Sequence, residues 1–291
     1  MMMAMATITS DGAAYRWREA GAQLERAHGV ARLGFVRRGS ETVLRECYQE
    51  AGLRIRLPRP APGMPPEAVV INTAGGLTGG DRFELAVTLG EGARAVVVSQ
   101  AAEKIYRSAG GVGAFSTSIT LAAGACLDWL PQEAILFDHA ALDRRLAVDM
   151  AGDASFLGVE SVVFGRLARG ESVDTAFLFD RWRIRRAGRL VYAEGLKFDG
   201  AVAGRLARPA AGAGALAAAS LVIVSPDAEA RLESVRERLA SLAEAGVEGG
   251  ASAFEGLLSA RLLSADPFAL RRGLVRLLEG LRGALPRVWS C

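Results

Sequence analysis

Hydrophobic and polar positions alternate with a period of two through much of the first 200 residues. The segment 83–89 alternates strictly, which places its apolar side chains on one face of a strand. The apolar run 95–98 follows the turn Gly90-Glu91-Gly92 and predicts a more fully buried strand. Two further alternating segments flank Ala187-Gly188 and predict a β-hairpin. Short strands between glycine-containing turns recur from about 23 to 197, which predicts an extended, mostly antiparallel β body.

The pattern changes near Arg208. The stretch Pro209–Ser220 is almost entirely alanine and glycine and is typical of a linker or a tight edge segment. After it the sequence predicts strand, helix, strand and helix. We therefore expect one unit over 1–291, mainly β with an α/β C-terminal part. The β body covers about 15–208, and the part at about 209–291, with two α-helices, packs on it.

Each of the two helices has a start signal. Ser225-Pro226 predicts an N-cap and first helical position after the strand 221–224, and Gly246 predicts the end of that helix. Asp266-Pro267 predicts the start of the second helix by the same logic. Each carries leucines or valines at helical spacing. The buried stripes are Leu232, Val235, Leu239 and Leu242 in the first helix, and Leu270, Leu274, Leu277 and Leu281 in the second.

Composition narrows the classes of function. The chain has 291 residues, 51% hydrophobic and 23% charged, which is enough for a full core. The net charge is only +3, and basic residues alternate with acidic ones along the whole chain. A dedicated nucleic-acid-binding protein would concentrate its basic residues on one face, so we expect no nucleic acid as partner.

Cysteine, histidine and long apolar segments are scarce. The three cysteines and two histidines form no CxxC, HxH or HxxxH pair, which argues against a disulfide framework or a closed zinc site. Met1–Ser10 lacks the basic and apolar regions of a signal peptide, and no run reaches the roughly 18 to 20 apolar residues that span a bilayer. We therefore expect a cytoplasmic protein without a membrane partner.

The densest local signal is the segment Asn72–Asp81, with four glycines at 75, 76, 79 and 80. No Gly-Lys-Ser/Thr follows, so it is not a P-loop, and a strand rather than a helix follows, so it is not a dinucleotide-binding turn. One interpretation is a structural turn between strands. The other treats Asp81, held on a rigid glycine platform, as a ligand or interface residue.

Two other polar segments leave alternatives open. Lys104, Tyr106 and Arg107 could bind an anion, or they could form a solvated turn after a buried strand. The acids between 127 and 138 could be imagined as a glycosidase pair, although exposed strand ends are the usual place for such residues. His28 and His139 have no nucleophile context, so we do not expect an enzyme.

Taken together, several segments resemble the urease accessory protein family UreD, also called UreH, from about residue 20 to the C-terminus. The resemblance depends on their order and spacing, not on any single motif. The matching segments are Gly75–Asp81, Ala102–Ser108, Trp129–Glu133, Phe164–Arg166, Gly170-Glu171, Arg181–Arg183 and Leu285–Trp289.

The resemblance implies a fold, a set of partners and a path for metal. It implies a β-solenoid-like body with two helices, and a non-catalytic scaffold that binds UreF directly and UreG through UreF. This assembly would dock on apo-urease and deliver nickel through a tunnel in the body. No tightly bound cofactor is implied, only nickel(II) in transit. The family's acidic positions on that path match Asp81, Glu160 and Glu194.

Coordination chemistry favours transit over storage. Imidazole and thiolate hold nickel(II) tightly, whereas carboxylate and water exchange it readily. Carboxylates spaced along a wet channel would attract a dication and still release it. For Glu194 the alternative is a strand residue paired with a neighbouring arginine. For the whole chain the alternatives are a generic β-rich interaction module unrelated to nickel and, behind it, an enzyme.

Overall fold

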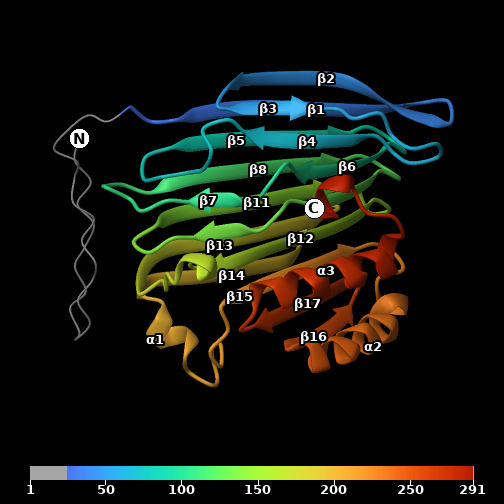
Figure 1. Ribbon diagram of the computed structural model, residues 1–291. Helices are drawn as coiled ribbons and strands as arrows, with labels where there is room; N and C mark the ends of the chain where they lie inside the picture. Colours follow the sequence, from blue (N-terminus) through green and yellow to red (C-terminus); the bar gives the residue numbers. More distant parts are fainter. Residues whose placement is uncertain (1–24, 291) are drawn as a thin grey trace.

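The computed structural model describes residues 25–290 and consists of two β-sheets that face each other, with helices near the C-terminal end (Figure 1). The expectation for Met1–Ser10, the first residues of the predicted β body and Cys291 lie outside the described residues.

The seven-stranded sheet has the order β14-β13-β11-β8-β5-β1-β2. Its strands are β1 (His28–Arg38), β2 (Glu41–Ala51), β5 (Arg82–Leu89), β8 (Gly113–Leu121), β11 (Ala141–Met150), β13 (Thr175–Arg186) and β14 (Arg189–Ala201). The ten-stranded sheet has the order β16-β17-β15-β12-β9-β6-β4-β3, with β10 beside β12 and β7 beside β10. Its strands are β3 (Leu53–Arg56), β4 (Glu67–Asn72), β6 (Arg94–Ser99), β7 (Glu103–Ile105), β9 (Cys126–Leu130), β10 (Ala134–Leu136), β12 (Ser155–Phe164), β15 (Ala217–Val224), β16 (Val247–Phe254) and β17 (Leu257–Ser264).

The chain winds between the sheets as a β-solenoid does. From β4 to β13 it passes repeatedly from one sheet to the other, so that β4, β6, β9 and β12 are neighbours in one sheet and β5, β8, β11 and β13 in the other. The predicted β-solenoid-like body is confirmed. The expectation of mostly antiparallel pairing is wrong for this body, because these neighbours all pair in parallel. A period of two indicates which face a side chain occupies but not the direction of the neighbouring strand.

Hairpins close the two ends of the solenoid. Strands β1 and β2 pair antiparallel at one edge. At the other, β13 and β14 form the hairpin predicted around Ala187-Gly188, with a bulge between Ile184 and Arg185. Both turn residues have positive φ, 49° and 78°, as a tight hairpin turn requires.

The central strands of the ten-stranded sheet are buried on both faces, whereas β16 at its edge is mostly exposed. One apolar core fills the space between the sheets and includes Phe35, Phe83 and Phe156. A second core lies on the outer face, where Val96 and Val98 belong to the same cluster as leucines of the C-terminal helices. This explains the continuous apolar run 95–98, which alternation alone would not produce, and it confirms the prediction of a fully buried strand.

The C-terminal part extends the ten-stranded sheet. Strand β15 pairs with β12, and β17 and β16 follow, so Ala217–Ser220 is strand and not linker. The helices are α1 (Ala203–Leu206), α2 (Leu232–Leu242) and α3 (Pro267–Arg282), besides the 3-10 turns Leu167–Arg169, Glu229–Arg231, Ala243–Ala245 and Arg287–Trp289. The division of the chain at 208 and 209 stays a prediction.

One predicted helix start is correct and one is wrong. Asp266 Oδ1 accepts the backbone N–H of Phe268 at 2.8 Å, as expected for the N-cap of α3. Ser225 instead donates its hydroxyl to Asp227 Oδ1 at 2.6 Å, and α2 begins only at Leu232 after a 3-10 turn. Gly246 ends the helical segment with a φ of 76°, as predicted.

Two ion pairs fasten α3 to the body. Arg282 Nε lies 2.8 Å from Asp128 Oδ2, and Arg271 Nη1 lies 3.0 Å from Glu133 Oε2. Two of the acids considered for a glycosidase pair therefore join β9 and the loop after it to a helix. No helix within residues 25–290 has the length and apolar character needed to cross a membrane.

Candidate functional site

The glycine segment and the polar segment around Lys104 form one structure. Leu77 N donates to Lys104 O at 2.8 Å, and Tyr106 N donates to Leu77 O at 2.7 Å. Gly76 has a φ of 153°, and a Cβ there would lie 2.4 Å from the Tyr106 ring. Glycine is needed here because the two segments approach closely. The interpretation of the segment as a structural turn is thereby supported.

Asp81 holds the base of this turn. Its side chain is buried, with 4% of its surface exposed. Its Oδ1 accepts the backbone N–H of Ala27 at 2.9 Å, and its Oδ2 accepts that of Thr78 at 2.8 Å. Both carboxylate oxygens are thus occupied by backbone donors, and Asp81 lies outside the walls of the two cavities described next.

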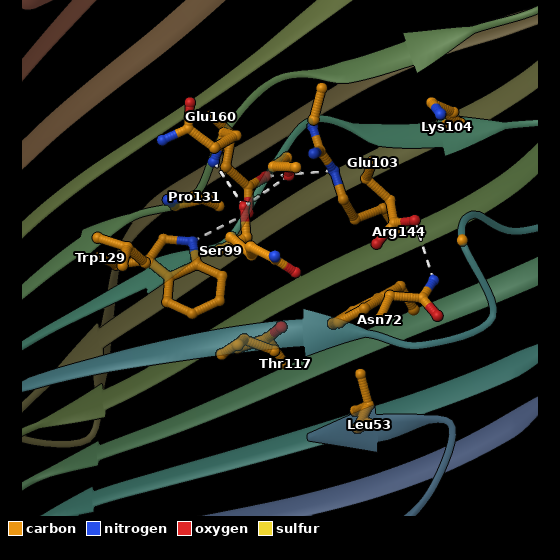
Figure 2. A pocket seen from close by; sticks show the side chains of 18 residues that line it. Leu53, Asn72, Ser99, Glu103, Lys104, Thr117, Trp129, Pro131, Arg144 and Glu160 are labelled. Atoms are coloured by element: carbon orange, nitrogen blue, oxygen red, sulfur yellow. Dashed lines mark hydrogen bonds and ion pairs between the residues drawn. The ribbon is translucent and has the colours of Figure 1, made fainter. Parts of the chain in front are cut away.

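A cavity of about 290 Å³, here called the Glu103 cavity, lies between the sheets beside this turn (Figure 2). Side chains from both sheets line it, including Thr117 of β8 and Trp129 of β9. Asn72 Nδ2 donates to Glu103 Oε1 at 3.0 Å on its wall. Gln132 also lines it, and its Nε2 is buried without a hydrogen-bond partner among the described residues. The cavity therefore presents one unsatisfied polar group within an apolar body.

Burial raises the pKa of Glu103 from the ordinary 4.5 to about 7. The hydrogen bond from Asn72 and the positive charge of Arg144 act in the opposite direction. A carboxyl group with this pKa changes its charge near neutral pH, unlike an ordinary glutamate.

Glu160 forms part of the wall at the far end of this cavity (Figure 2). It projects from β12 toward the seven-stranded sheet, where Trp182 Nε1 donates to its Oε2 at 2.9 Å. Trp129 Nε1 donates to its Oε1 at 3.0 Å, and Arg144 Nε lies 3.3 Å from its Oε2. Burial raises the pKa of Glu160, and the guanidinium and the two indoles oppose that shift by stabilising the carboxylate.

Arg144 completes the wall from the opposite sheet. Its Nε donates to Asp180 Oδ1 at 3.0 Å, and its Nη2 pairs with Asp180 Oδ2. The two residues are register partners on the parallel strands β11 and β13. Burial would lower the pKa of the guanidinium, but the carboxylates of Asp180 and Glu160 outweigh it and raise the pKa, so Arg144 stays charged.

A second cavity of about 200 Å³, here called the Glu194 cavity, lies on the other side of this wall. Arg144 and Glu160 line both cavities. Glu194 Oε1 accepts the hydroxyl of Ser220 at 3.0 Å and pairs with Arg261 Nη2 at 2.9 Å, while Tyr192 donates to the other oxygen. The Arg261 side chain is 67% exposed, so this cavity lies next to the surface.

The structure therefore brings two of the three predicted positions together. Glu160 and Glu194 line the same cavity, whereas Asp81 belongs to the turn. The expected alternative for Glu194, a pair with an arginine, is also present in the form of Arg261. Both descriptions hold at once, because Glu194 lines the cavity and is also paired with Arg261.

Sequence reasoning missed Arg144, Asp180 and the special environment of Glu103. The sequence did contain a signal for Arg144 and Asp180. Arg144 stands between Leu142 and Leu146 in the alternation of β11, and Asp180 stands two positions before the buried Trp182 of β13. A charged residue at an inward position of an alternating strand indicates a buried polar site. Glu103 offered no such pattern, because its burial comes from the surrounding strands.

The acidic side chains on the cavity walls are spread out and not clustered. Within residues 25–290, no group of three or more histidine, cysteine, aspartate or glutamate side chains is arranged to hold a metal ion. The carboxylates stand singly or share an arginine.

The comparisons with known proteins agree along the length of the chain. A profile of the UreD urease accessory protein family matches residues 27–290. A urease accessory protein UreD of Methylobacterium sp. (strain 4-46) is 49% identical over 270 residues, covering 91% of this chain and 95% of the relative. UreD of Rhizobium etli is also 49% identical, over 91% of this chain and 96% of the relative. UreD of Azorhizobium caulinodans is 46% identical, over 91% of this chain and 97% of the relative. This chain belongs to the UreD family of urease accessory proteins.

Proposed function

We propose that this chain is a non-catalytic scaffold and metallochaperone for the insertion of nickel into apo-urease. It would work in the cytoplasm in a complex with UreF and UreG, binding UreF directly and UreG through UreF. Membership of the UreD family supports a role in urease maturation. The nickel path and the partners come from the resemblance of the motifs to that family.

The observation that carries the proposal is the charged wall between the two cavities. Burying a charge in an apolar core costs several kcal/mol unless it is paired, so a fold gains little from placing three charges there. Glu160, Arg144 and Asp180 meet at this place, with a cavity on each side. A path for a cation through the body explains this charged wall better than a contribution to the stability of the fold does.

The proposed route runs between the sheets past Glu103, Glu160 and Glu194. Each carboxylate gives nickel(II) a favourable but weak contact, and none is joined by an imidazole or thiolate that would hold it. Moderate binding at successive points allows an ion to move on. A place for Asp81 on the route stays a prediction, and a metal ion there would have to displace two backbone N–H donors.

The test is urease loading in a host that carries the urease structural and accessory genes. Activity and nickel per urease are measured under limiting nickel, with this chain, without it, and with Glu160→Gln or Glu194→Gln. We expect apo-urease to accumulate without the chain and loading to fall in both variants. Glu91→Gln, in an exposed turn, is the control. Full loading in the absence of the chain would contradict the proposal and leave the generic interaction module.

A further inference from the structure

Arg144 stands where a cation on the proposed route would have to pass. Its side chain forms part of the wall of both cavities, and it is only 13% exposed. Figure 2 shows it opposite Glu160, and the two residues form an ion pair. A positive charge fixed in the wall that both cavities share repels any cation that approaches from either side, and this repulsion is strong where water is scarce.

The charges around Arg144 match a dication once the arginine has left. Glu160 and Asp180 carry two negative charges, and the guanidinium neutralises one of them while it bridges the pair. The remaining single charge does not balance a dication. If Arg144 moves away, the two carboxylates balance one divalent cation fully. Arg144 therefore occupies the position that this cation would take.

Glu103 offers Arg144 a second partner on one side of the wall. The two side chains lie near each other in Figure 2, and the Glu103 carboxylate helps to raise the pKa of Arg144. Glu103 is bound by Asn72 and keeps further acceptor capacity for a guanidinium. The arginine side chain is long and flexible at its stem, so it can change partner without moving the strand.

We propose that Arg144 is the gate of the passage: its guanidinium holds Glu160 and Asp180 in the place of a divalent cation, and it turns to Glu103 when a cation passes. The inference rests on the proposed function, because a gate has a role only if a cation travels the route. The gate explains how the ion is released, which the carboxylates alone do not explain. The returning guanidinium displaces it.

The first test measures nickel(II) binding to the purified full chain by equilibrium dialysis with nickel chloride. Arg144→Gln removes the competing cation, so we expect one site that binds nickel about tenfold more tightly than in the wild type. This gain should disappear in the double variant Arg144→Gln/Glu160→Gln. Arg144→Lys keeps a positive charge and should bind nickel as weakly as the wild type. Arg145→Gln is the matched control, because Arg145 is the next residue and is 58% exposed. Arg144→Gln that binds no more nickel than the wild type overturns the gate.

The second test does not depend on the folding of Arg144→Gln. Glu103→Gln keeps the hydrogen bond from Asn72 through its amide oxygen but cannot take up the negative charge that would receive Arg144. We expect nickel per urease to fall about fivefold relative to Glu91→Gln, because the open state is less populated. Unchanged loading overturns the gate.

The two proposals fail in different ways. Normal nickel loading of urease in each of the single variants Glu160→Gln and Glu194→Gln would contradict the route. This holds whatever the nickel binding of the Arg144 variants. Impaired loading in these variants, together with unchanged nickel binding in Arg144→Gln, keeps the route and removes the gate.

Discussion

The glycine turn and the wall between the cavities each centre on a carboxylate that is almost fully buried. Asp81 is 4% exposed and Glu160 is 5% exposed. Asp81 binds two neutral backbone donors, one of them three residues away. Glu160 binds two indoles and a guanidinium that come from three other strands in both sheets. Equally buried carboxylates therefore have different surroundings: Asp81 fixes local backbone, and Glu160 is paired with a charged side chain from the opposite sheet.

The largest expected effect comes from breaking the wall. Arg144→Gln leaves two buried carboxylates without their cation, so the free energy of unfolding should fall by about 3 to 5 kcal/mol. Urea denaturation in the absence of divalent metal measures it. Adding Asp180→Asn should recover part of the loss, because one of the uncompensated charges is then gone. A loss below about 1 kcal/mol would contradict the view of this wall as a charged unit.

The stability of the glycine turn should depend on the space around its backbone and not on charge. In Gly76→Ala the new Cβ would meet the Tyr106 ring at 2.4 Å and Lys104 O at 2.5 Å, so we expect a loss of about 3 kcal/mol. Gly75→Ala is the matched control. Its φ is 77° and no atom lies within 4 Å of the new Cβ, so only about 1 kcal/mol should be lost. Thermal unfolding of the two variants measures this difference in stability. Equal losses would contradict the close approach of Gly76 to the Tyr106 ring.

Asp81→Asn sharpens the comparison directly. The amide keeps one acceptor oxygen but turns an N–H group toward the second backbone donor, so stability should fall by about 2 kcal/mol. Urea denaturation gives this value. Nickel binding to the purified chain should stay unchanged, since Asp81 lies outside both cavities. A change in nickel binding at equal stability would place Asp81 on the route after all.

The smallest effect concerns pH. The folded chain keeps a proton on Glu103 up to about pH 7, whereas the unfolded chain loses it near 4.5. The folded state thus binds more protons in this window, and the contribution of Glu103 to stability falls as pH rises through it. Glu103→Gln should match the wild type at pH 4.5 and exceed it by about 1 to 2 kcal/mol at pH 8. Urea denaturation at both pH values tests this, and a constant difference would contradict the raised pKa.

The local part of the fold is predictable from sequence. The alternation in β5, the hairpin around Ala187-Gly188 and the start of α3 at Asp266-Pro267 depend on residues close in the chain. Strand direction depends instead on where the chain returns after leaving for the other sheet. The parallel pairing of the body was therefore missed.

The site was predictable only in part, for the same reason. Glu160 and Glu194 came from the resemblance to a family, and the structure places them on one cavity. Arg144 and Asp180 could have been found as charged residues at inward positions of alternating strands. The pairing of Arg144 with Glu160 could not, because that contact joins opposite sheets.

The two indoles bound to Glu160 make the tryptophan fluorescence of the protein sensitive to changes at this carboxylate. Of the tryptophans among the described residues, Trp129 and Trp182 both donate to this one carboxylate, while Trp289 donates to the backbone oxygen of Leu130 in the other core. Emission from an indole shifts with the electric field around it, and a paramagnetic ion nearby quenches it. Any exchange of guanidinium for nickel beside Glu160 is therefore visible as a change in native fluorescence, with Trp289 as an internal reference and no added dye.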